Sequence, residues 1–202
     1  MKKSLLLLLL LPLVTVTAFG QESRQDISVS GSALIPPGIV GNGAHLNATV
    51  GQGVLISYRY LLTPRSGLEL NYQYAQEVQH FRIPTNNVLV HNRFQEMSGA
   101  YVRSFIFRNW NPFVEVGIGG FVYSPIDDSK TNTTGISSTL SRNTNIGMLY
   151  GGGFAYEISP SFDIRAEYRG LVFKTPTFGQ TNFSTGRYFN VSDPVIGIAY
   201  HF

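Results

Sequence analysis

The residues best suited to metal binding or proton transfer are four histidines, because imidazole is a common metal ligand and general base. They are His45, His80, His91 and His201. No two of them are spaced as a metal-binding pair, so we expect no metal site. An acyl-transfer site would need a histidine beside a serine, with an acid to orient the ring. His80 and His91 flank one segment and Glu77 and Glu96 lie nearby in sequence, but no His-x-Ser follows residue 20.

We therefore predict that the protein is not an enzyme, and a lipid-modifying hydrolase or acyltransferase remains the open catalytic alternative. Glycine-rich stretches at 41–43, 51–53 and 151–153 do not lie between a strand and a helix with phosphate-loop spacing. No basic cluster of the kind that binds nucleic acid follows the N-terminal segment, and no Cys is present. We expect no cofactor and no nucleic-acid partner.

A second set of polar residues recurs at alternate positions within otherwise apolar segments. Its members are Glu69, Asn71, Gln73, Glu96, Glu115, Arg165, Glu167 and Arg169. Alternation with a period of two is typical of strands, so these side chains would share one face of a sheet. Charges of both signs in a narrow space can pair, whereas isolated buried charges are costly. We predict that this set forms a structural polar network inside a barrel.

The elements that would position this network are eight segments with alternating apolar and polar residues, and no segment shows a helical stripe. The segments are 26–35, 53–60, 68–76, 94–105, 112–123, 146–158, 162–173 and 187–202. In the fourth segment either face can be called apolar; we place Glu96 inward and Arg103 near a rim. The predicted fold is all-β, an eight-stranded antiparallel up-and-down transmembrane β-barrel.

Three features favour a membrane barrel over a soluble, lipocalin-like barrel with a ligand cavity. Charged residues make up only 13% of the chain, about half of the usual share. Long connections (36–48, 80–93, 124–145 and 174–186) alternate with short ones, as in outer-membrane barrels. Aromatic residues fall where two interfacial girdles would lie. These are Tyr60, Tyr156, Tyr200 and Phe202 at the short turns, with Phe94 and Tyr123 at the long loops.

The N-terminus has the pattern of a secretory signal peptide. Lys2 and Lys3 precede an apolar run from Leu5 to about Val16, which is followed by the small residues Ala18 and Gly20. We predict a cleaved signal peptide at 1–20 and an outer-membrane β-barrel domain at 21–202. The chain would be exported by the general secretion route to a bacterial outer membrane. Loss of Lys2 and Lys3 lowers the formal net charge from +3 to +1.

These features, with PFVEVGIGG in the fifth segment and IGIAYHF at the end, resemble the small eight-stranded outer-membrane β-barrel family. That family includes OmpX/Ail-like proteins and the transmembrane domain of OmpA. The resemblance implies that the last strand, ending in an aromatic residue, is read by the barrel-assembly machinery. This role would map onto Ile196, Ile198, Tyr200 and Phe202.

The expected partners are therefore outer-membrane lipid and, during biogenesis, the assembly machinery; we expect a monomer with an unidentified surface ligand. The predicted function is a structural or surface-interaction role carried by long extracellular loops, with the lumen filled by polar side chains. A small or gated pore is the other alternative, because Gly117, Gly119, Gly151 and Gly153 would leave space in the lumen.

Overall fold

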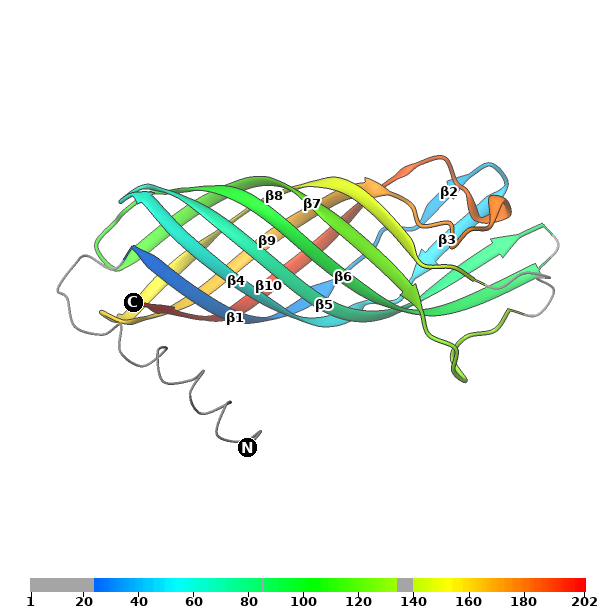
Figure 1. The fold of residues 1–202 in the computed structure, drawn as a ribbon, viewed down its shortest axis with the longest axis horizontal. Coiled ribbons are helices and arrows are strands. Elements are labelled where there is room, and N and C mark those ends of the chain that lie inside the picture. Colours follow the sequence, from blue (N-terminus) through cyan, green and yellow to red (C-terminus); the bar gives the residue numbers. More distant parts are fainter. Residues whose placement is uncertain (1–23, 85, 134–139) are drawn as a thin grey trace, which may run out of the picture.

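A computed structural model describes residues 24–84, 86–133 and 140–202, and it shows a closed barrel of eight antiparallel strands (Figure 1). The predicted signal peptide lies outside the described residues. None of the described residues forms a helix long and apolar enough to cross a bilayer. The barrel strands are β1 (Gln25–Leu34), β4 (Gly51–Thr63), β5 (Ser66–Ile83), β6 (Asn86–Ser104), β7 (Trp110–Pro125), β8 (Asn143–Ser159), β9 (Phe162–Lys174) and β10 (Tyr188–His201).

Each barrel strand pairs with its neighbours in sequence, and β1 closes the cylinder by pairing with β10, where Val29 lies opposite Ile198. Closure gives the backbone N–H and C=O groups of every strand a partner on both sides, which a lipid environment requires. The predicted fold class is confirmed. The eight strands coincide with the eight predicted segments, and several strands are longer than predicted.

The two ends of the barrel differ, as Figure 1 shows. At one end, here called the short-turn end, tight connections join β4 to β5, β6 to β7 and β8 to β9. The start of β1 and the C-terminus lie at the same end. The opposite, long-loop end carries the remaining connections.

The second long connection, predicted at 80–93, is not a loop, and that prediction is wrong. β5 and β6 continue as a paired hairpin as far as Ile83 opposite Asn86. Phe81, Val88 and Val90 point inward and are fully buried, so this segment forms strands for the usual packing reason. Its outward face carries polar residues, which made the sequence look loop-like.

The first long connection also contains strands. β2 (Ile39–Gly41) and β3 (Ala44–Ala48) form a small hairpin. β3 continues the sheet by pairing with the part of β5 nearest the long-loop end. The turn is Asn42–Gly43, where both residues have positive φ (49° and 78°). Two-residue hairpin turns with positive φ at both positions favour Asn-Gly, because Asn and Gly adopt positive φ more readily than other residues. The last long connection includes a short 3-10 helix, η1 (Thr181–Phe183).

The outward face of the barrel is a band of exposed aliphatic and aromatic side chains, such as Ile56, Leu70 and Ile198. Towards the long-loop end this band gives way to tyrosines whose hydroxyls contact polar side chains. The pairs are Tyr72–Gln95, Tyr74–Gln76, Tyr150–Asn190 and Tyr168–Ser192. An apolar band bounded by amphipathic rings matches the cross-section of a bilayer.

The interior has two layers. Polar and charged side chains fill the part nearer the short turns, and an apolar cluster fills the part nearer the long loops. Phe94 stacks on Phe121 and lies 5.1 Å from Tyr123 between ring centroids, inside this cluster. The prediction that Phe94 and Tyr123 belong to an outer girdle is therefore wrong. Both have the inward parity of their strands and are buried, whereas the tyrosine pairs above occupy the outer boundary.

Candidate functional site

All eight residues of the predicted polar set are buried in the barrel interior. Two of them belong to a cluster near the short-turn end. Arg59 on β4 donates to Glu69 on β5 (Nε–Oε2 2.7 Å), and Arg165 on β9 donates to Asp26 on β1 (3.0 Å). Arg165 also lies 3.9 Å from Glu69, which links the two ion pairs. The guanidinium of Arg59 lies over the ring of Phe113 at 4.8 Å.

A second cluster surrounds Arg169, which is fully buried in the middle of β9. Its guanidinium pairs with Glu96, with Asp193 at 3.1 Å and, more loosely, with Glu115 at 3.6 Å. Gln73 completes the cluster by donating to Asp193 at 3.0 Å. Three strands, β6, β7 and β10, thus contribute carboxylates to one arginine, and a fourth, β5, supplies Gln73.

The structure brings Gln73, Glu96, Glu115 and Arg169 together and places Glu69 with Arg165 in the first cluster. Asn71 and Glu167 face the same interior, but within the described residues the amide of Asn71 has no hydrogen-bond partner. Both carboxylate oxygens of Glu115 are also without one. The interior between the barrel strands has more carboxyl groups than guanidinium groups. The acids are Asp26, Glu69, Glu77, Glu96, Glu115, Asp163, Glu167 and Asp193, and the arginines are Arg59, Arg165 and Arg169.

Sequence reasoning missed three members of the clusters, Asp26, Arg59 and Asp193. Arg59 has the inward parity of its strand, so the alternation that identified Glu69 could have identified it too. Asp193 likewise has the inward parity of β10, whereas Asp26 lies at the start of β1, where parity is harder to read from sequence. The clusters hold charges in pairs beneath an apolar layer, and at the short-turn end Asp26, Arg59 and Arg165 line a cavity of about 150 Å³.

Two of the four histidines each contact a carboxylate in the described part of the chain. His91 Nδ1 lies 2.7 Å from Asp128, and His201 Nε2 lies 2.8 Å from Asp163 at the short-turn rim. The acid beside His91 is thus Asp128, not Glu77 or Glu96. Within the described residues, no hydroxyl is hydrogen-bonded to the other nitrogen of His91, and no group of three or more His, Asp or Glu side chains could hold a metal ion.

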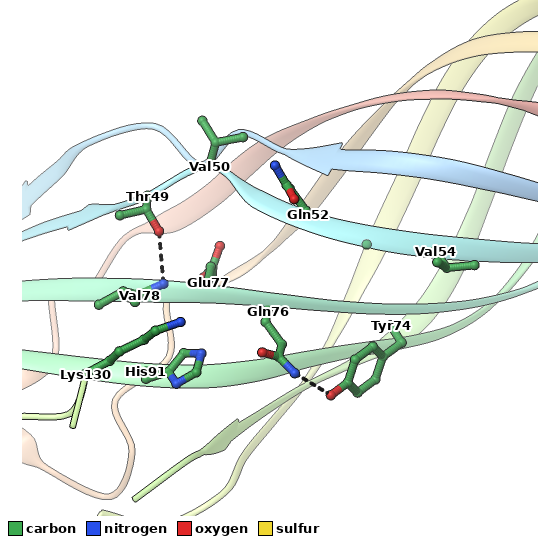
Figure 2. Close-up of a pocket in the computed structure, with 11 residues that line it drawn as sticks. Thr49, Val50, Gln52, Val54, Tyr74, Gln76, Glu77, Val78, His91 and Lys130 are labelled. Carbon is green, nitrogen blue, oxygen red and sulfur yellow. Dashed lines mark hydrogen bonds between the residues drawn. The ribbon is translucent and has the colours of Figure 1, made fainter. Parts of the chain in front are cut away.

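A groove of about 600 Å³ lies where β3 passes into β4 (Figure 2). Three residues there (49–51) face two on β5 (77–78), since Ala48 pairs with Gln79 and Gln52 with Gln76. The bulge is held by Thr49, whose N–H donates to the carbonyl of Val78 (2.9 Å) and whose hydroxyl accepts from the N–H of Val78 (3.0 Å). The volume of the groove is within the range of small-molecule sites. We call this groove the bulge groove.

Comparison with known families identifies the chain. Residues 6–202 match the family model described as "Outer membrane protein beta-barrel domain". The protein belongs to this family. Membership places this outer-membrane barrel in the bacterial outer membrane. A sequence comparison with curated proteins finds no match.

Solved structures support the fold of this outer-membrane barrel. It is similar to the outer membrane protein OprG from Pseudomonas aeruginosa, with a TM-score of 0.64 and 12% identity over 91% of this chain and 98% of OprG. It is similar to Neisserial surface protein A, with a TM-score of 0.59 and 14% identity over 89% of this chain and 98% of that one. The outer membrane protein AlkL has a TM-score of 0.51 and 15% identity over 92% and 93%. These likenesses concern the fold.

Proposed function

We propose that the protein is a non-conducting outer-membrane barrel whose work is structural or is done by the elements at its long-loop end. The long-loop end would face the cell exterior and the short turns the periplasm, as in other barrels of this architecture. One observation carries the proposal: the interior is filled through both of its layers, by Arg169 with its carboxylate partners and by the apolar cluster above them.

The apolar layer also supports the proposal that the barrel does not conduct. Phe173 lies four residues after Arg169 on β9 and packs against Phe121 at 4.6 Å between ring centroids. Phe178 and Phe183, from the last long connection, contact Phe81 and are buried. A chain segment thus folds over the end of the barrel and buries aromatic rings there. Dispersion and burial make such a layer costly to open.

Planar-bilayer recording of the purified protein tests this proposal. We expect no reproducible conductance from the wild-type protein. Arg169→Ala together with Phe173→Ala removes one large side chain from each layer and should give measurable currents if the filling is what blocks ion flow. Steady conductance of the wild type would refute the proposal and favour the small pore. Protease accessibility of the β5–β6 hairpin on intact cells tests the orientation separately.

We also propose that the chain is exported by the general secretion route, on the basis of its N-terminal sequence pattern. From the geometry of its outward residues, we propose that β10 carries the assembly signal. Ile196, Ile198, Tyr200 and Phe202 are all exposed on the outward face, and the rings of Tyr200 and Phe202 are stacked at 6.1 Å. This continuous apolar stripe beside the seam with β1 is a suitable surface for an assembly factor.

A further inference from the structure

Exposed charges at the long-loop end are strongly unbalanced. Within the described residues, the exposed acids of this end are Asp127 and Asp128. The exposed cations are Arg82, Arg93, Lys130, Arg142, Lys174 and Arg187. Most other acids of the described chain are buried inside the barrel. The outward surface beyond the apolar band is therefore basic, a feature that the near-neutral composition conceals.

One of these cations lines the bulge groove, and a second lies opposite one of the lining residues. Arg93 on β6 lies directly opposite Gln76 in the β5–β6 register, and both side chains are exposed on the outward face. Lys130 lines the groove, and Figure 2 shows its side chain extending towards Val78. Within the described part of the chain, neither cation has an ion-pair partner within 4.0 Å. Both charges are therefore available to an anion.

The acids near the groove are already engaged. Asp128 contacts His91 at 2.7 Å and accepts the backbone N–H of Lys130 at 2.9 Å. Glu77 is buried and accepts a hydrogen bond from Gln79, which faces the interior. The net character of the outer rim of the groove is therefore positive.

The lower walls of the groove are apolar. Val50 and Val54 are exposed along one side and Val78 lies on the other, and the apolar band of the barrel continues directly below through Ile56 and Leu70. Tyr74 and Gln76, which line the groove, form one of the tyrosine pairs that mark the edge of this band. The groove thus spans the boundary between the acyl region and the head-group region.

We propose that the bulge groove binds the phosphorylated head group of a lipid in the outer leaflet. Arg93 and Lys130 would hold the phosphate, Gln52 and Gln76 would contact neighbouring polar groups, and an acyl chain would lie along Val54 and Ile56. Arginine and lysine both suit phosphate, through a planar fork and a point charge respectively. The proposal depends on the orientation given above and is independent of whether the barrel conducts.

The test is native mass spectrometry of the detergent-solubilised protein titrated with bis-phosphorylated lipid A. Chemically dephosphorylated lipid A is the matched lipid, and inorganic phosphate is added as a competitor. The variant is Arg93→Gln with Lys130→Gln. The control, Arg142→Gln with Lys174→Gln, removes the same charges from exposed positions beside β8 and β9, away from the groove. A heat-modifiable gel shift confirms that each variant is folded.

We expect the wild type to prefer the phosphorylated lipid and the groove variant to bind it about 25-fold more weakly, at about five-fold per lost cation. The control should change binding less than about two-fold, and Arg93→Lys with Lys130→Arg should retain it. Equal losses in both variants would show diffuse attraction and overturn the site. No preference for the phosphorylated lipid, or displacement by inorganic phosphate at equal concentration, would overturn a lipid as the occupant.

Discussion

Arg59 and Glu69 lie directly opposite each other on β4 and β5 and form a buried ion pair, with Arg59 Nη2 2.6 Å from Glu69 Oε2. The pair faces the interior, where neither charge can be solvated by bulk water. Removing one partner leaves the other unpaired, which typically costs about 3–5 kcal/mol, whereas removing both costs much less.

We therefore expect Arg59→Met to lower the free energy of unfolding by about 3 kcal/mol, and Arg59→Met with Glu69→Leu to recover most of that loss. The measurement is urea unfolding from lipid vesicles. The single tryptophan, Trp110, is an intrinsic fluorescence probe at the short-turn end. A double variant no more stable than Arg59→Met would show that the ion pair is not the source of the effect.

The barrel and its inward and outward faces could be predicted because alternation is a local property of each strand. Glu96 was placed inward correctly even in the ambiguous fourth segment, and Arg103 lies exposed near the short-turn end, where its side chain donates to Ser66. The partners within the interior could not be predicted, because pairing of Arg169 with Glu96 and Asp193 depends on strand register around a closed cylinder. The apolar layer was missed because Phe94 and Tyr123 look the same in sequence whether they face lipid or lumen.

Glu115 and Glu96 should respond in opposite ways to loss of charge. Glu96 pairs closely with Arg169, while Glu115 lies 3.6 Å from it and both oxygens of Glu115 are without a hydrogen-bond partner in the described protein. Because carboxyl groups outnumber guanidinium groups there, Glu115→Gln removes repulsion and should raise the urea midpoint. Glu96→Gln removes a close ion pair and should lower it. The same direction for both substitutions would contradict this account of the cluster.

Gly151 should be intolerant of a side chain, because a Cβ there would lie 2.6 Å from Oε1 of Glu115 and 2.8 Å from the carbonyl oxygen of Tyr168. We expect Gly151→Ala to cost about 1–3 kcal/mol in the same unfolding assay, the usual effect of overpacking. Gly120→Ala is the matched control, since a Cβ at Gly120 meets nothing within 4 Å. Equal stability of the two variants would mean that the glycine does not make room for Glu115.

The contact between His91 and Asp128 should make the segment 126–131 sensitive to acid. Desolvation alone would raise the pKa of Asp128, but hydrogen bonds from His91 and the Lys130 N–H outweigh it and lower the pKa. A carboxyl with a lowered folded-state pKa stabilises the fold above its unfolded pKa, and this contribution is lost as the pH falls through the folded value. The protection factors of the amides in 126–131, taken relative to their intrinsic exchange rates, should therefore fall at acid pH. Asp128→Asn should show low protection already at neutral pH, whereas Asp127→Asn should behave as wild type.

Phe202 should matter more for assembly than for the stability of the finished barrel. Its ring is exposed and stacks on Tyr200, and its backbone N–H donates to the carbonyl of Gln25 whatever the side chain. Phe202→Ala should thus change the free energy of unfolding by less than about 1 kcal/mol, the usual size of an exposed aromatic contact. Its level in the outer membrane of expressing cells should nevertheless fall several-fold. Ile118→Ala, at an exposed outward position of β7 away from the β1–β10 seam, is the control and should assemble normally. Normal membrane levels of Phe202→Ala would show that the aromatic side chain is not part of an assembly signal.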